Sequence, residues 1–319
     1  MAYTLIQQVI IMFLLAFVGY LMFRTGKITP EGSKSLANIL LYLSLPCVII
    51  NGFQLEYSHE RLIGLLLSSL LSLIVLVMSI LISRLFFRRN VIESFSAAFS
   101  NPGFFGIPLI LATLSDGSVF YIASFIAFLN LFQWTYGVSL MTKEAKTSDK
   151  KGSFKKSSLS QSILQQLLKL IKAPFMIAII IGLFFFLSGF QMPVLLNKCV
   201  TQIANLNTPI AMFTIGIYLA QTDIFKMFLK PRLYLVALVR MIVIPVAAML
   251  LLSLVPNTWL EMKLAILIAA ACPVGSNVAV YAQLHNNDYL YAVETVVLST
   301  LFSIITIPVL ITLANNIWA

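Results

Sequence analysis

The fold is decided by residues 94–111, which read Ser-Phe-Ser-Ala-Ala-Phe-Ser-Asn-Pro-Gly-Phe-Phe-Gly-Ile-Pro-Leu-Ile-Leu. This stretch is apolar enough for a bilayer, but its middle carries Asn101, Pro102, Gly103 and Gly106. Proline has no N–H to donate to the preceding turn, and the glycine beside it lets the backbone leave helical geometry. A membrane helix is therefore expected to break here, and its freed polar groups must line an enclosed or watery cavity.

The composition of the whole chain is that of a membrane protein. Of its 319 residues 60% are hydrophobic and 10% charged, and the mean hydropathy is +0.97, which excludes a soluble domain. Apolar runs of membrane-spanning length recur from end to end and predict an all-α polytopic protein. The ten expected spans are 3–23, 34–53, 62–86, 92–114, 117–141, 173–189, 193–220, 231–255, 260–284 and 289–316.

The basic residues are distributed unevenly between the two sets of alternate loops. Seventeen of the 21 Lys and Arg residues fall on one side of the ten spans, and three fall on the other. The positive-inside rule then predicts a cytoplasmic basic side and two external termini in the cell membrane. The net charge of +10 is explained by this orientation, without a nucleic-acid partner.

Residues 142–172 form the one long polar insertion between the predicted spans. This stretch begins Lys/Ser-rich, and apolar residues at helical spacing follow from 163 to 171. It is interpreted as a cytoplasmic linker whose second part is an amphipathic helix on the membrane surface. The linker separates a first five-span unit, 1–141, from a second unit, 173–319.

The two units carry matching interruptions. Ala-Ala-Phe-Ser-Asn-Pro-Gly at 97–103 corresponds to Ala-Ala-Ala-Cys-Pro-Val-Gly at 269–275, in the fourth span of each unit. Because each unit has five spans, the two enter the membrane in opposite senses. This predicts an inverted repeat whose broken fourth and ninth helices cross near the middle of the membrane, where secondary transporters hold their substrates.

The two breaks define the candidate binding site. Helix N-termini carry partial positive charge and free N–H groups, so two that face each other suit a carboxylate, with neither a metal ion nor a covalent step. The expected site residues are Asn101, Pro102, Gly103, Gly106, Pro273, Gly275, Ser276 and Asn277. Weaker candidates come from matching positions in the second spans, namely Ser44, Pro46, Asn207, Thr208 and Pro209.

Two ionisable residues, Arg240 and Glu294, fall well inside predicted spans. Buried charges in membranes are usually paired or functional. One interpretation is a structural ion pair between the two residues. The other makes Arg240 a bidentate clamp for a substrate carboxylate and Glu294 a proton-coupling group.

The sequence offers little for other classes of function. The only histidines, His59 and His285, fall in loops, and neither a nucleophile–base set nor a metal-ligand motif is apparent, so no enzyme and no cofactor are predicted. A channel remains an alternative, but a repeated break suits alternating access better. Proton coupling, anion exchange and uniport are left open, and sodium coupling is disfavoured because neither break offers a carboxylate.

The sequence resembles the auxin efflux carrier family, particularly bacterial members that include malate permeases. The similarity rests on 98–109, Ala-Phe-Ser-Asn-Pro-Gly-Phe-Phe-Gly-Ile-Pro-Leu, on 239–245, on 270–283 and on 295–308. It implies a fold like that of the sodium–bile acid symporters, with spans 1, 2, 6 and 7 as a scaffold and spans 3–5 and 8–10 as a mobile unit. It also implies elevator-type transport of small organic anions. Alternatives are a sodium-coupled symporter or an anion channel, and a homodimer through the scaffold spans is left open.

One position departs from that family pattern. Similar bacterial chains often have Asn-Val-Gly or Asn-Thr-Gly in the fourth span, where this chain has Asn101-Pro102-Gly103. Since proline restricts the backbone, the first break is expected to be stiffer than in those relatives.

Overall fold

The computed structural model describes residues 2–115, 117–142 and 172–319. These residues form helices, loops and one isolated β-bridge. In chain order, the elements are α1 (Ala2–Arg24), α2 (Pro30–Ile39), η1 (Leu40–Ser44), α3 (Leu45–Gly52), α4 (His59–Phe86), α5 (Val91–Ala98), η2 (Pro102–Gly106), α6 (Ile107–Thr113), α7 (Ser118–Phe132), η3 (Gln133–Gly137), α10 (Pro174–Ser188), α11 (Val194–Ala204), α12 (Asn207–Gln221), α13 (Ile224–Phe228), α14 (Pro231–Leu238), η4 (Val239–Val243), α15 (Ile244–Leu252), η5 (Asn257–Trp259), α16 (Leu260–Ala271), α17 (Asn277–Leu284) and α18 (Tyr289–Trp318). The predicted linker and its amphipathic helix lie, apart from their end residues, outside the described ranges.

Seven helical segments are long and apolar enough to cross a membrane. They are Tyr3–Arg24, Pro30–Gly52, His59–Phe86, Ser118–Thr142, Val194–Gln221, Pro231–Leu252 and Tyr289–Trp318. Two shorter apolar helices, Pro102–Thr113 and Pro174–Ser188, lie within the fourth and sixth predicted spans. The all-helical, multi-pass membrane class is thus confirmed, whereas the count of ten spans and the inverted repeat stay predictions.

At three positions a proline widens the helix without ending it there. The π-helical turns η1, η2 and η4 each end two residues before a proline, at Pro46, Pro108 and Pro245. A proline ring crowds the carbonyl of the preceding turn and offers no N–H, and a wider turn relieves both conflicts. The helix therefore continues through these positions.

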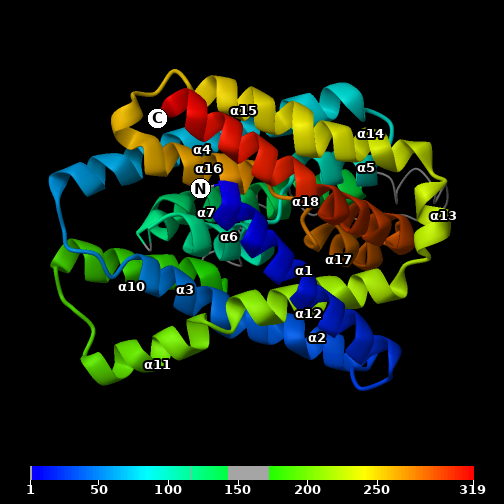
Figure 1. Ribbon diagram of the computed structural model, residues 1–319, viewed down its shortest axis with the longest axis horizontal. Coiled ribbons are helices and arrows are strands. Elements are labelled where there is room, and N and C mark those ends of the chain that lie inside the picture. Colours follow the sequence, from blue (N-terminus) through cyan, green and yellow to red (C-terminus); the bar gives the residue numbers. More distant parts are fainter. Residues whose placement is uncertain (1, 116, 143–171) are drawn as a thin grey trace, which may run out of the picture.

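The helices form two groups (Figure 1). In the first group, α1 packs along α12, and α3 lies between α10 and α11. In the second group, α4 packs against α5 and α7, while α16 packs against α7, α15 and α18. The interrupted helix of α5, η2 and α6 contributes to both regions, since α6 contacts α1 and η2 contacts α12. The helix breaks therefore lie where the two groups meet.

Glycine permits very close packing of α1 on α12. A Cβ atom at Gly19 would meet the backbone of Phe213, and one at Gly216 would meet the backbone of Ala16. In a membrane, where apolar side chains gain little by leaving lipid, such backbone contact is a main source of helix association. The two helices are therefore held together along one face by small residues.

Candidate functional site

The two predicted interruptions are present and touch each other. Helix α5 ends at Ala98 and η2 begins at Pro102, while α16 ends at Ala271 and α17 begins at Asn277. Between them Ser100 and Val274 form an antiparallel β-bridge. The backbones of two helices that are separate in sequence thus meet at their breaks.

Gly275 is required for this contact. Its N–H donates to the carbonyl of Phe99 at 2.9 Å, and a Cβ atom there would lie 2.9 Å from the carbonyl oxygen of Ser100. That separation is shorter than the usual contact between a methyl carbon and a carbonyl oxygen. Any larger residue would push the two breaks apart.

Side-chain hydrogen bonds join the predicted site residues across the crossing. Asn101 Nδ2 donates to Ser276 Oγ at 3.0 Å. Asn101 directly precedes η2 and Ser276 directly precedes α17, which are the two outgoing half-helices, that is, those that begin after the breaks. The starts of the two half-helices are therefore in direct contact. Asn277 Nδ2 donates to Gln133 Oε1 at 2.8 Å. Gln133 belongs to η3 and was not among the predicted site residues, although an amide within an apolar span was a signal for it.

Both outgoing half-helices begin with unused donors. Among the described residues, no acceptor is found for the backbone N–H groups of Gly103, Phe104, Ser276 and Asn277. The first N–H groups of a helix lack partners within the helix and carry its partial positive charge, roughly +0.5 at each N-terminus. Two positive helix ends therefore approach each other inside the protein.

Arg240 lies at the opposite ends of the interrupted helices. The residue is 1% exposed, and its Nη1 donates to the carbonyls of Ala97 at 3.1 Å and Ala98 at 3.3 Å. It also donates to Ser79 Oγ at 3.3 Å, and its Nη2 donates to the carbonyl of Ala270. These carbonyls end α5 and α16, where each helix carries roughly −0.5 of an elementary charge. One guanidinium thus matches the negative ends of two half-helices.

Glu294 is in an ion pair, but its partner is not the one suggested by the sequence. Lys230 Nζ lies 2.7 Å from Glu294 Oε1 and 2.6 Å from Oε2. Lys230 directly precedes α14, and Glu294 lies in the first turns of α18, which packs against α14. Lys230 and Glu294 therefore lie at a similar depth in the protein. Arg240 lies deeper, and its Nη1 and Nη2 groups are already bonded to the carbonyls at the ends of α5 and α16.

The weaker candidates are only partly near the crossing. Asn207 Nδ2 donates to the carbonyl of Gly103 at 3.3 Å, which links α12 to the first break. Ser44 Oγ instead donates to the carbonyl of Ile203 at 3.0 Å, within the first helix group. Thr208 is half-buried and makes no side-chain hydrogen bond that the structure records among the described residues. Only Asn207 of this set contacts a break by a hydrogen bond.

The remaining predicted residues shape the backbone of the crossing. A Cβ atom at Gly106 would lie 3.0 Å from Cys272 Sγ, so η2 passes closely over the second break. Pro102 and Pro273 are buried at the two breaks, while Pro46 and Pro209 are half-buried in α3 and α12. These residues set the path of the chain and offer no side-chain donor.

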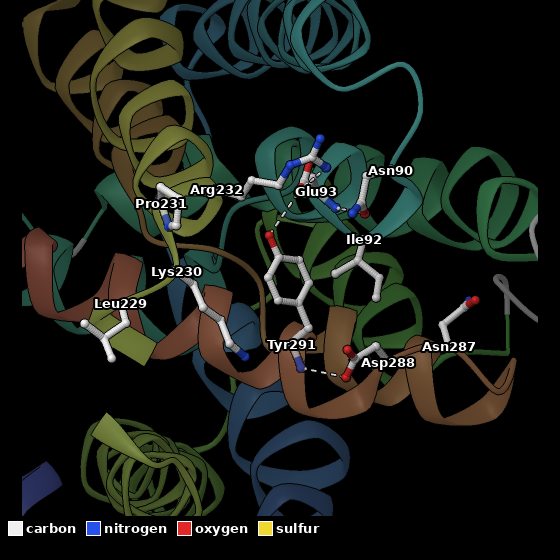
Figure 2. A pocket seen from close by; sticks show the side chains of 10 residues that line it. All are labelled: Asn90, Ile92, Glu93, Leu229, Lys230, Pro231, Arg232, Asn287, Asp288 and Tyr291. Carbon is white, nitrogen blue, oxygen red and sulfur yellow. Dashed lines mark hydrogen bonds and ion pairs between the residues drawn. The ribbon is translucent and has the colours of Figure 1, made fainter. Parts of the chain in front are cut away.

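A cavity of about 680 Å³ opens where α5, α14 and α18 begin, and Figure 2 shows its lining. Arg232 Nη1 lies 3.3 Å from Glu93 Oε1, and the hydroxyl of Tyr291 donates to the same oxygen at 2.9 Å. Glu93 is buried, and Asn90 caps its helix by accepting from the Glu93 N–H. Together with the Lys230–Glu294 pair, these contacts tie three helix ends into one charged cluster.

No metal cluster is found in the described part of the chain, where no three His, Cys, Asp or Glu side chains gather closely enough to hold an ion. The crossing instead offers amides, a hydroxyl and backbone N–H groups. These are neutral donors, which suit an anion better than a cation.

Apolar helices that are interrupted inside the protein, with polar ends meeting at the breaks, are typical of membrane transporters. Residues 4–311 match the protein family described as membrane transport protein, and the chain belongs to this family of auxin efflux carrier-like proteins. The resemblance inferred from the motifs is thereby confirmed, and the protein is a transporter and not an enzyme. A relative from Rhizobium meliloti (strain 1021), named "Putative malonate transporter", is 24% identical over 311 residues, covering 95% of this chain and 93% of that protein.

Proposed function

We propose that this protein is a secondary active transporter of small organic anions, di- or monocarboxylates such as malonate or malate. The observation that carries the proposal is the contact between Asn101 and Ser276, which brings together two helix N-termini with unused N–H groups. Two ends of roughly +0.5 each are matched by one carboxylate. The name of the Rhizobium relative supports the same class of substrate.

In this proposal, one set of groups at the crossing binds the substrate and another holds the half-helices in place. The substrate carboxylate accepts from the N–H groups at Gly103, Phe104, Ser276 and Asn277, while Arg240 neutralises the C-termini of α5 and α16. Arg240 then holds the half-helices in place and is not a substrate ligand. Because it donates to both helices, it fixes the distance between the breaks that the anion spans.

The proposed architecture is ten spans in two inverted repeats, with α5–α6 and α16–α17 as the broken fourth and ninth helices. We assign α1, α2–α3, α10 and α11–α12 to a scaffold and the other spans to a mobile unit that moves as an elevator. The division follows the two packing groups of Figure 1. The ion pairs at Glu93 and Glu294 join helices within the mobile unit, which favours its movement as one body.

Exposed apolar side chains on the scaffold helices leave room for a homodimer in the membrane. On α1 these include Ile6, Ile10, Leu14 and Phe17. The same side chains suit lipid, so the dimer is a proposal that cross-linking in native membranes tests.

Counterflow in proteoliposomes tests the proposed function. Vesicles loaded with unlabelled malonate are diluted into trace labelled malonate, and a carrier is expected to accumulate the label transiently. A parallel experiment with malate and an acetate control defines the substrate class. Label that equilibrates without overshoot and without saturation would assign a channel instead, and uptake driven by a sodium gradient would assign sodium coupling.

A further inference from the structure

Gln133 carries an unused donor at the crossing. The residue is 1% exposed, and its Nε2 is buried with no hydrogen-bond partner in the described ranges. Buried side-chain donors in proteins are almost always satisfied, so an orphaned amide calls for an explanation. The other end of the same amide is occupied, because Oε1 accepts from Asn277.

The unused amide nitrogen is directed at the start of α17. It lies 3.5 Å from the position that a Cβ atom on Gly275 would occupy. The N–H groups of Ser276 and Asn277, which follow this glycine, also have no acceptor among the residues the structure describes. Side-chain and backbone donors therefore gather at the start of α17.

These donors are all uncharged. The side-chain partners recorded for Asn101, Ser276, Asn277 and Gln133 are one another. The guanidinium of Arg240 donates instead to the carbonyls of Ala97, Ala98 and Ala270, at the C-termini of α5 and α16. An anion at the start of α17 thus meets amide donors and a helix dipole, without a basic side chain.

We propose that Gln133 is a substrate-recognition residue, whose Nε2 donates to a carboxylate oxygen of the transported anion at the N-terminus of α17. Asn277 is then a positioning residue, because its side chain holds the Gln133 amide with the oxygen turned away from the anion. The inference rests on the proposed function and adds a ligand from α7–η3, a span outside the two broken helices.

The test compares malonate binding by purified wild-type protein, Gln133→Met and Gln133→Glu, using calorimetry and the shift in melting temperature. Methionine has nearly the size of glutamine but no donor, so the dissociation constant is expected to rise at least about tenfold, as for a lost hydrogen bond to a charged group. Glutamate replaces the donor by an acceptor of like charge and is expected to reduce binding further. Both variants are expected to fold without ligand, since glutamate keeps an acceptor for Asn277 and methionine removes the unsatisfied donor together with that acceptor.

Asn130→Met is the matched control. Asn130 lies one turn earlier on the same helix, and its Nδ2 donates to the carbonyl of Ile126 in that helix. This variant is expected to bind malonate like the wild type. The melting temperature without ligand separates the two roles, because a merely structural glutamine would lower it and leave the dissociation constant unchanged.

The outcomes distinguish the inference from the function on which it rests. If the wild type binds malonate and Gln133→Met or Gln133→Glu binds within about twofold of it, Gln133 is not a ligand and the transport proposal stands. If the wild type binds neither malonate nor malate, the proposed substrate class is wrong and this inference falls with it.

Discussion

Arg240 illustrates how a buried cation is stabilised without a carboxylate. Its acceptors are the carbonyls that end α5 and α16 and the hydroxyl of Ser79. Two helix C-termini of roughly −0.5 each supply about one unit of negative charge, which equals the charge of the guanidinium. Arginine fits this place because its planar fork donates in two directions at once, which an ammonium on a single stem does less well.

Replacing Arg240 by methionine is expected to lower the free energy of unfolding by at least about 3 kcal/mol, because two helix ends each lose a charged hydrogen bond worth about 1.5–3 kcal/mol. Arg240→Lys is expected to recover only part of this, since one ammonium cannot serve both ends. Unfolding in detergent, followed by circular dichroism, measures the effect. Arg24→Met, at an exposed site near Tyr20, serves as the control and is expected to change little.

A double variant tests whether Arg240 is coupled to Glu294. Since Glu294 is held by Lys230, the costs of Arg240→Met and Glu294→Gln are expected to add. A double variant that is more stable than Arg240→Met alone would instead mean that Arg240 and Glu294 are coupled.

At the scale of helices, the interruptions could be predicted from sequence, but the wide turns could not. Asn101-Pro102-Gly103 and Pro273-Val274-Gly275 combine a missing donor with a flexible glycine, and the chain leaves the helix at both. Pro46, Pro108 and Pro245 have no glycine among the two residues that follow them, and there a π turn accommodates the proline. A glycine among the two residues after the proline thus marks both breaks, whereas the sequence did not show that the other three prolines would be accommodated by wider turns.

The residues of the site likewise fall into those that the sequence predicted and those that it did not. Residues at the breaks could be predicted because the backbone itself supplies the donors there. An amide in an apolar span was a signal for Gln133, but the partners of Gln133 and Lys230 depend on which helix faces the crossing or the charged cluster, and one sequence does not fix that rotation. Pairings between spans are determined by packing, which periodicity alone does not specify.

The contact of α1 with α12 gives a prediction for a pair of elements. Gly216→Ala places a methyl group against the backbone of Ala16 and is expected to destabilise the protein by about 1–3 kcal/mol, the usual range for overpacking. Gly32→Ala is the matched control, because its new Cβ atom would meet only side-chain atoms of Ile28 and Thr29 at 3.5 and 3.6 Å. There the gain in helix propensity is expected to leave stability unchanged or slightly higher. Equal melting temperatures for the two variants would contradict the close packing.

At the scale of the whole molecule, the charge distribution predicts how the protein is oriented in the membrane. The loops that carry Arg24, Lys27, Arg88 and Arg89 lie on the same side as the ends of α5 and α14, where the Glu93 cluster gathers. The positive-inside rule predicts that this side faces the cytoplasm. The cluster in Figure 2 is then expected to face the cytoplasm.

Cysteine labelling in intact cells tests this orientation. In a variant whose Cys47, Cys199 and Cys272 are replaced by serine, Gln191→Cys lies in the exposed loop between α10 and α11 and is expected to react with a membrane-impermeant maleimide. Thr25→Cys lies in the exposed loop after α1 and is expected to react only after the cells are permeabilised. The expectation rests on seventeen basic residues against three, because loop charge directs the insertion of membrane proteins. Labelling of Thr25→Cys in intact cells, with Gln191→Cys protected, would reverse the membrane orientation and put the Glu93 cluster outside, while the crossing of the broken helices would stay the same.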